Sequence, residues 1–220
     1  MAYPTVGTPS ATYSGSGTSV TGTPTSAASG DIIVAVVMST SASTTLSTPS
    51  GWTRVESTLQ PNDFSMGLWY HDGSASDPTF DLSISSDWRL NYVTVSGGSL
   101  PPDATSQAEN SSTSSFDVAT TSTVAECLHL VAAGIDVSSA RTLTTTGTEI
   151  VNDRPNPLQL VLSYVDVATA STSTQTLTNS GTAQQWGGIG IMIPPGAPPA
   201  SPYQHRIVVP RAAAHQAAGW

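Results

Sequence analysis

Short apolar runs alternate with turn signals along most of the chain, and this pattern restricts the fold more than any other feature of the sequence. Runs of roughly six to ten residues are bounded by Gly, Pro, Ser and Asp, as in 30–38 and 64–73. The spacing of three and four residues that marks an amphipathic helix is almost absent. Repeated short strands separated by turns are typical of an all-β sandwich or barrel.

The composition supports strands rather than disorder. About 29% of the residues are Ser or Thr, and only 10% are charged. Thr fits a pleated surface and Ser is common in turns, while the regular apolar runs between them supply a core. A chain of 220 residues can bury that core without disulfides, and the single cysteine, Cys127, excludes an internal one. We therefore predict a folded antiparallel β-sandwich.

Nine segments carry the strand pattern, and we expect the Gly15-Ser16-Gly17 segment to be a hairpin turn. The expected strands are 32–38, 52–59, 64–71, 79–85, 88–95, 127–133, 142–151, 158–167 and 186–193.

The two halves of the chain resemble each other. Four landmarks recur in the same order about 95 residues later, and two similar half-sandwiches of about four strands would close into one jelly roll. The matched pairs are Asp31–Val37 with Glu126–Ala132, Trp52–Val55 with Thr148–Val151, Phe64–Asp72 with Leu158–Asp166, and Trp88 with Trp186.

The C-terminal segment differs from the body. Pro194–Pro202 is too rich in proline to continue a central strand, so we expect a semi-rigid extended linker. The predicted organisation is a β-sandwich domain at 1–193, a Pro-rich linker at 194–203 and a C-terminal docking arm at 204–220. Fifteen acidic residues and four Arg give the body a formal charge of −11, whereas two Arg and no acidic residue give the tail +2.

Two interpretations of this tail stay open. It is either a loose chain end or an arm that adds a short strand or an apolar plug to a partner. A docking arm with two Arg and no acid would favour an acidic partner surface. The side chains that we expect to bind a partner are Tyr203, Arg206, Ile207, Val208, Val209, Arg211 and Trp220.

The sequence offers little chemistry for catalysis, so we expect no enzyme, no metal and no cofactor. Cys127 lies inside an apolar run and is interpreted as a small core residue. The chain has no Lys, which rules out the usual phosphate-binding loop. Paired carboxylates remain open, although most acids sit in turns. No histidine has the spacing of a zinc ligand, and His129 is expected to be a satisfied strand residue.

The same sequence limits the partners. An acidic, Lys-free surface argues against nucleic acid, and no apolar run is long enough for a membrane span. The start has no secretory signal pattern, so we expect folding in a cytoplasm. Four tryptophans either pack in the core or stack on sugar rings, and we favour packing; these are Trp52, Trp69, Trp88 and Trp186.

Several short motifs resemble a jelly-roll domain of actinobacteriophage structural proteins. They are Gly30–Val37, the sequence Thr48-Pro49-Ser50-Gly51-Trp52-Thr53, Leu68-Trp69-Tyr70 and Leu100–Ser106. The resemblance extends over roughly residues 4–193. The second half departs from it, because Gly147-Thr148-Glu149 stands where the family has Gly-Trp-Thr.

This resemblance implies a non-enzymatic virion protein, assembled in the host cytoplasm, of the capsid decoration, head-fibre or minor tail type. Its expected partners are the major capsid protein or another virion protein, together with further copies of itself in a homo-oligomer. The alternative is a tail or baseplate protein, or a carbohydrate-binding module, that contacts host surface glycans.

Overall fold

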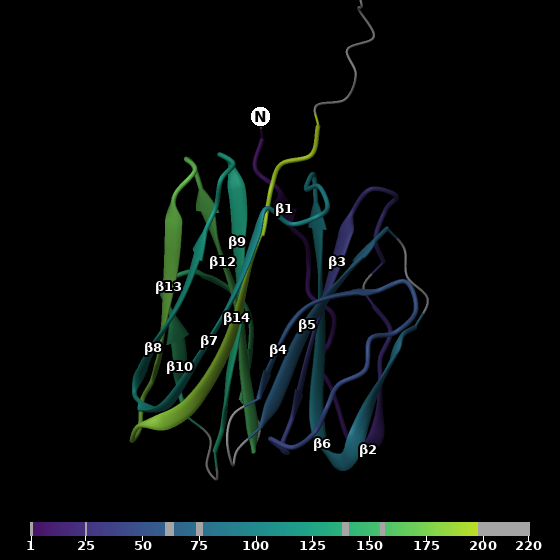
Figure 1. The fold of residues 1–220 in the computed structure, drawn as a ribbon, viewed down its shortest axis with the longest axis vertical. Coiled ribbons are helices and arrows are strands. Elements are labelled where there is room, and N and C mark those ends of the chain that lie inside the picture. Colours follow the sequence, from purple (N-terminus) through teal and green to yellow (C-terminus); the bar gives the residue numbers. More distant parts are fainter. Residues whose placement is uncertain are drawn as a thin grey trace, which may run out of the picture.

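Every regular element in the described residues is a β-strand (Figure 1). The computed structural model describes residues 2–24, 26–59, 64–73, 77–137, 141–154 and 157–197. Within these ranges the strands form antiparallel sheets of six, five and three strands that pack against one another. The predicted all-β sandwich is confirmed, and the jelly-roll type stays a prediction.

The strands are named in chain order. They are β1 (Thr5–Val6), β2 (Tyr13–Thr21), β3 (Ile32–Ser39), β4 (Thr53–Leu59), β5 (Ser65–Asp72), β6 (Thr79–Ser96), β7 (Ala104–Thr113), β8 (Ser115–Thr121), β9 (Cys127–Asp136), β10 (Leu143–Thr145), β11 (Thr148–Asp153), β12 (Leu158–Val167), β13 (Thr172–Asn179) and β14 (Gln184–Ile193).

The two halves, β1–β6 and β7–β14, share one strand order. The first main sheet runs β1-β6-β3-β5-β4 and the second runs β7-β14-β9-β12-β11, so each position has an equivalent. Each half also has a short outer layer. In the first half it consists of β2, the start of β6 and a bridge between Leu46 and Leu82. In the second half it is the three-stranded sheet β8-β13-β10. Two similar halves are therefore present, each with more strands than the four expected.

Strand register fixes which residues are equivalent. Ile32 lies opposite Asp72 and Leu128 lies opposite Asp166, so Ile32 corresponds to Leu128. Matching Asp31 to Glu126 is thus displaced by one residue, and such a displacement would turn each side chain to the other face.

The other landmarks agree with this register. Trp88 is opposite Ser39 and Trp186 is opposite Ile135, which makes the two tryptophans equivalent. A β-bulge also recurs at the same place in both halves: the register shifts between Arg54 and Glu56 in β4, and between Glu149 and Val151 in β11.

Some expected boundaries were wrong. The segment Gly15–Gly17 is part of β2, not a hairpin turn. The expected strands 79–85 and 88–95 are one continuous strand, β6, because its two ends pair with different neighbours. The expected strand 142–151 is divided into β10 and β11. The Ser/Thr-rich strands β7, β8 and β13 were not expected.

The largest apolar cluster lies between the two main sheets. It takes residues from β3, β5 and β6 of the first half and from β9, β12 and β14 of the second. Separate clusters fill the space between each main sheet and its outer layer. An ion pair also joins the halves, with Arg89 Nε 3.6 Å from Asp153 Oδ2.

The segment after β14 is bound to the body where it starts. Ser99 N–H donates to Pro194 O at 2.9 Å, and Gly196 N–H donates to Gly97 O at 2.7 Å. The segments that follow β6 and β14 therefore lie side by side, and residues 194–197 of the expected linker belong to the body. The rest of the linker, including Tyr203, and the whole arm at 204–220 lie outside the described residues.

We predict that the halves, produced together as separate chains 1–98 and 99–220, associate and co-purify, because each alone would expose its side of the shared apolar cluster. Co-purification on a tag at one chain, followed by size-exclusion chromatography, measures this. Leu162→Asp, inside the shared cluster, should abolish association, whereas the exposed Thr174→Asp should not. Two separately stable monomers would contradict the prediction.

Candidate functional site

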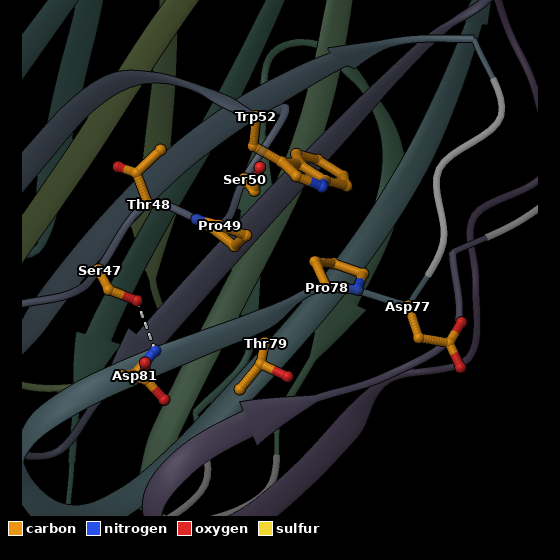
Figure 2. A pocket seen from close by; sticks show the side chains of 9 residues that line it. All are labelled: Ser47, Thr48, Pro49, Ser50, Trp52, Asp77, Pro78, Thr79 and Asp81. Carbon is orange, nitrogen blue, oxygen red and sulfur yellow. Dashed lines mark hydrogen bonds between the residues drawn. The ribbon is translucent and has the colours of Figure 1, made fainter.

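A hollow of about 430 Å³ opens on the outer side of the first half, between the turn before β4 and the start of β6 (Figure 2). Hydroxyl groups, two carboxylates, two prolines and one indole surround it. The lining residues are Ser47, Thr48, Pro49, Ser50, Trp52, Asp77, Pro78, Thr79 and Asp81.

Local backbone chemistry forms the turn at one side of the hollow. Trp52 N–H donates to Pro49 O at 3.2 Å, and Gly51 has φ +82°, a left-handed conformation that glycine adopts without strain. Ser47 and Asp81 hold this turn to β6: Ser47 N–H donates to Asp81 O at 2.9 Å, and Asp81 N–H donates to Ser47 Oγ at 2.7 Å. The frame of the hollow is therefore fixed by reciprocal hydrogen bonds.

Trp52 forms part of the wall, with 7% of its surface exposed. Its ring packs against Phe80, with centroids 5.9 Å apart, and against Tyr92 at 6.0 Å. The Trp52 indole N–H has no hydrogen-bond partner among the described residues. Trp69, by contrast, donates its indole N–H to Thr48 Oγ1 at 3.1 Å and so anchors the turn.

The two carboxylates are exposed and give the hollow a negative charge. Thr23 Oγ1 donates to Asp77 Oδ2 at 3.2 Å, and Ser19 Oγ donates to Asp81 Oδ1 at 3.4 Å. Hydrogen-bonding groups beside an apolar ring suit a ligand that carries both hydroxyl groups and apolar surface.

The second half lacks the turn that builds the hollow. Thr146 and Thr176 repeat the reciprocal hydrogen bonds of Ser47 and Asp81, at 3.0 Å each. Thr148, like Thr53, starts its strand opposite a tyrosine. Five residues separate Ser47 from Thr53, but only Gly147 separates Thr146 from Thr148. The first half is therefore four residues longer at this point than the second.

The interior beneath this position differs in the same way. Gly147 occupies the place of Trp52, and a Cβ there would collide with Gln175 Oε1. Gln175 in turn occupies the place of Phe80, because Thr176 matches Asp81. An aromatic interior in the first half is therefore replaced by a polar one in the second.

His129 lies at the centre of this polar interior and is fully buried. Its Nε2 is 3.0 Å from Thr120 Oγ1 and its Nδ1 is 3.0 Å from Ser173 Oγ. Gln175 donates through Nε2 to His129 O at 2.8 Å, and its Oε1 accepts from Ser163 Oγ at 2.7 Å. Burial lowers the His129 pKa to about 4, which keeps the ring neutral at pH 7. The prediction of a satisfied strand histidine is confirmed.

The other predicted positions give structural rather than reactive groups. Cys127 is buried, as expected for a core residue, and burial raises the pKa of its thiol. Trp69 and Trp186 are fully buried, and Trp52 and Trp88 are each 7% exposed, which confirms packing for all four tryptophans. Within the described ranges, no group of three His, Cys, Asp or Glu residues is placed to hold a metal ion.

The hollow was not predicted from the sequence, although its turn, Thr48-Pro49-Ser50-Gly51-Trp52, stood out as a motif. The seven side chains predicted to bind a partner lie outside the described residues. In the part of the chain that the structure describes, no helix is long and apolar enough to cross a membrane. Comparison with models of protein families, with curated proteins and with solved structures finds no match.

We predict that His129 makes the folded state less stable in acid. Because its folded pKa lies below the value of about 6.5 expected in the unfolded chain, the unfolded state binds the proton more readily. The contribution is intact above about pH 6.5 and is lost as the pH falls towards about 4, by roughly 3 kcal/mol.

Urea unfolding at a series of pH values measures this effect. His129→Gln keeps hydrogen-bonding groups for Thr120 and Ser173 but removes the titration. The difference in unfolding free energy between wild type and this variant should change across pH 4–6.5. A difference that stays constant with pH would show that the buried ring does not titrate in this way.

Proposed function

We propose that the chain is a non-enzymatic structural protein of a bacteriophage particle, most simply a capsid decoration protein. In this proposal the β body is displayed on the particle surface, and residues 204–220 bind the major capsid protein or another virion protein. The observation that carries it is the contrast between an acidic body and a short tail that has two Arg, no acid and a Pro-rich segment before it.

The geometry of the body supports an arm. The chain leaves the body at Pro194–Ala197, at the same end as the N-terminus (Figure 1). Hydrogen bonds with Gly97 and Ser99 hold Pro194 and Gly196 to the body, so the attachment point of the proposed arm is fixed. A partner at this end would contact the arm and leave the outer layers β2 and β8-β13-β10 exposed.

Charge and side-chain type support the same partner. Arg206 and Arg211 flank the apolar run Ile207–Val209, and a segment of this kind fits a β-strand edge or groove on an acidic surface. Trp220, together with Tyr203, would add aromatic contact area, which often carries much of the energy of an interface. The seven predicted side chains thus have a role in the proposal as partner-binding residues.

A second candidate is a tail or baseplate protein, or a carbohydrate-binding module, that contacts host surface glycans. The hollow beside Trp52 favours it, because an indole, carboxylates and hydroxyl groups meet there. Both candidates place the protein in the virion, as a homo-oligomer assembled in the host cytoplasm, without a cofactor.

We predict that a chain truncated after Ala197 folds but is not incorporated into particles. The truncation removes none of the described strands, so the thermal unfolding temperature should stay within a few degrees of the full-length value. Particles assembled from a phage genome carrying the truncated sequence are purified, and copies of the protein per particle are counted by mass spectrometry.

A charge reversal gives a matched control. Arg206→Glu with Arg211→Glu should reduce the copies per particle at least tenfold, whereas Arg154→Glu, on an exposed position of the body, should not. Normal incorporation of the truncated chain would refute the arm as the anchor.

A further inference from the structure

We infer that the hollow beside Trp52 is a binding site for a neutral sugar unit of a glycan. This site is formed by the body alone and does not depend on the C-terminal arm or on the location of the protein in a particle.

The internal repeat shows that the turn lining the hollow is specific to the first half. Both halves keep the reciprocal hydrogen bonds at Ser47 and Thr146, the tyrosine opposite the first residue of β4 or β11, and the β-bulge that follows. The second half forms these features with one residue where the first uses five. The four further residues of the first half also fill its outer cluster through Trp52, and together with β6 they form the hollow, which is lined from residues 47–52 and 77–81.

Trp52 contributes a polar group that is directed at the hollow. The side chain is more than nine-tenths buried, lines the hollow, and has an indole N–H without a partner in the described residues. Figure 2 shows the indole nitrogen on the side of the ring nearest Pro78. The N–H itself is open to the hollow rather than fully buried, so it can donate a hydrogen bond to a hydroxyl oxygen of a ligand.

The rest of the lining matches the two kinds of surface that a sugar ring presents. Pro49, Pro78 and the edge of the indole offer apolar contact to the C–H groups of the ring. The hydroxyl groups of Ser47, Ser50 and Thr79 can donate and accept, as the hydroxyl groups of a sugar do. The volume of about 430 Å³ lies in the range of small-molecule sites and accommodates one sugar unit with an open side for the rest of a chain.

Charge selects among the sugars. The carboxylates of Asp77 and Asp81 accept hydrogen bonds from neutral hydroxyl groups, and charged acceptors make the stronger bonds. The same charges repel sialic acids, uronic acids and sugar phosphates. Arg54 is not part of the lining; its guanidinium donates to Leu46 O at 3.3 Å and lies 5.8 Å from the Trp69 ring.

Titration calorimetry and NMR chemical-shift mapping on the full chain test the site. The probes are the methyl glycosides of glucose, galactose and mannose, with N-acetylneuraminic acid as the anionic comparison. We expect at least one neutral glycoside to bind with a dissociation constant on the order of 1 mM, which suits a ligand of about a dozen heavy atoms, and the anionic sugar to bind at least tenfold more weakly.

Three variants separate the site from the fold. Trp52→Phe removes the N–H but keeps an aromatic ring in the core, and Asp81→Asn removes a charge at an exposed position; each should weaken binding by about fivefold to tenfold. Thr176→Ala changes the position in the second half that is equivalent to Asp81, and it should leave binding unchanged. Thermal unfolding of every variant shows that the protein remains folded.

Distinct outcomes would overturn the inference. These are no binding of any neutral glycoside by the folded wild type, tighter binding of the anionic sugar, or shifts that map away from residues 47–52 and 77–81. Sugar binding that persists after truncation at Ala197, together with failed incorporation into particles, would support this site and the arm independently.

Discussion

The structure depends on the apolar cluster that the two main sheets share. Each sheet has an outer face covered by its own short layer, with an apolar cluster between them, but its inner face is covered only by the other half. Side chains such as Val34, Leu68, Leu130 and Leu162 are buried there, each worth about 1.5–3 kcal/mol relative to exposure. Neither half can leave this face in water, so the repeat folds as one body.

This shared cluster leaves the outer interiors free to differ. In the first half the space is filled by Trp52, Trp69 and Phe80, while in the second half Gly147, Ser163 and Gln175 stand at the equivalent positions. Hydrogen bonds around His129 satisfy the polar groups that the change buries, since an unsatisfied group would cost about 1–3 kcal/mol. The same frame thus supports an aromatic interior in the first half and, in the second, an apolar cluster beside the hydrogen-bonded groups around His129.

The sequence predicted strands well where apolar residues run together and poorly where they do not. The bounds of Leu158–Val167 are predicted to the residue, because both faces of the strand are buried over its first six residues and give a largely apolar run. In β13 the inward side chains are Ser173, Gln175, Leu177 and Asn179. Because only Leu177 among them is apolar, the sequence shows no alternating apolar pattern there. The hollow joins residues 47–52 to residues 77–81, and that proximity follows from β6 pairing rather than from any local signal.

Comparing the two halves distinguishes features that serve the common fold from features that only one half has. Features that both halves keep, namely the strand order, the β-bulges and the equivalent Trp88 and Trp186, serve the common fold. Features that one half has alone are free of that requirement: the turn that bears Trp52 is one, and the tail after Ala197 is another. Substitutions in the turn leave the cluster shared by the two sheets intact, but Trp52 also packs in the outer cluster of the first half, so changing it affects stability as well as ligand binding.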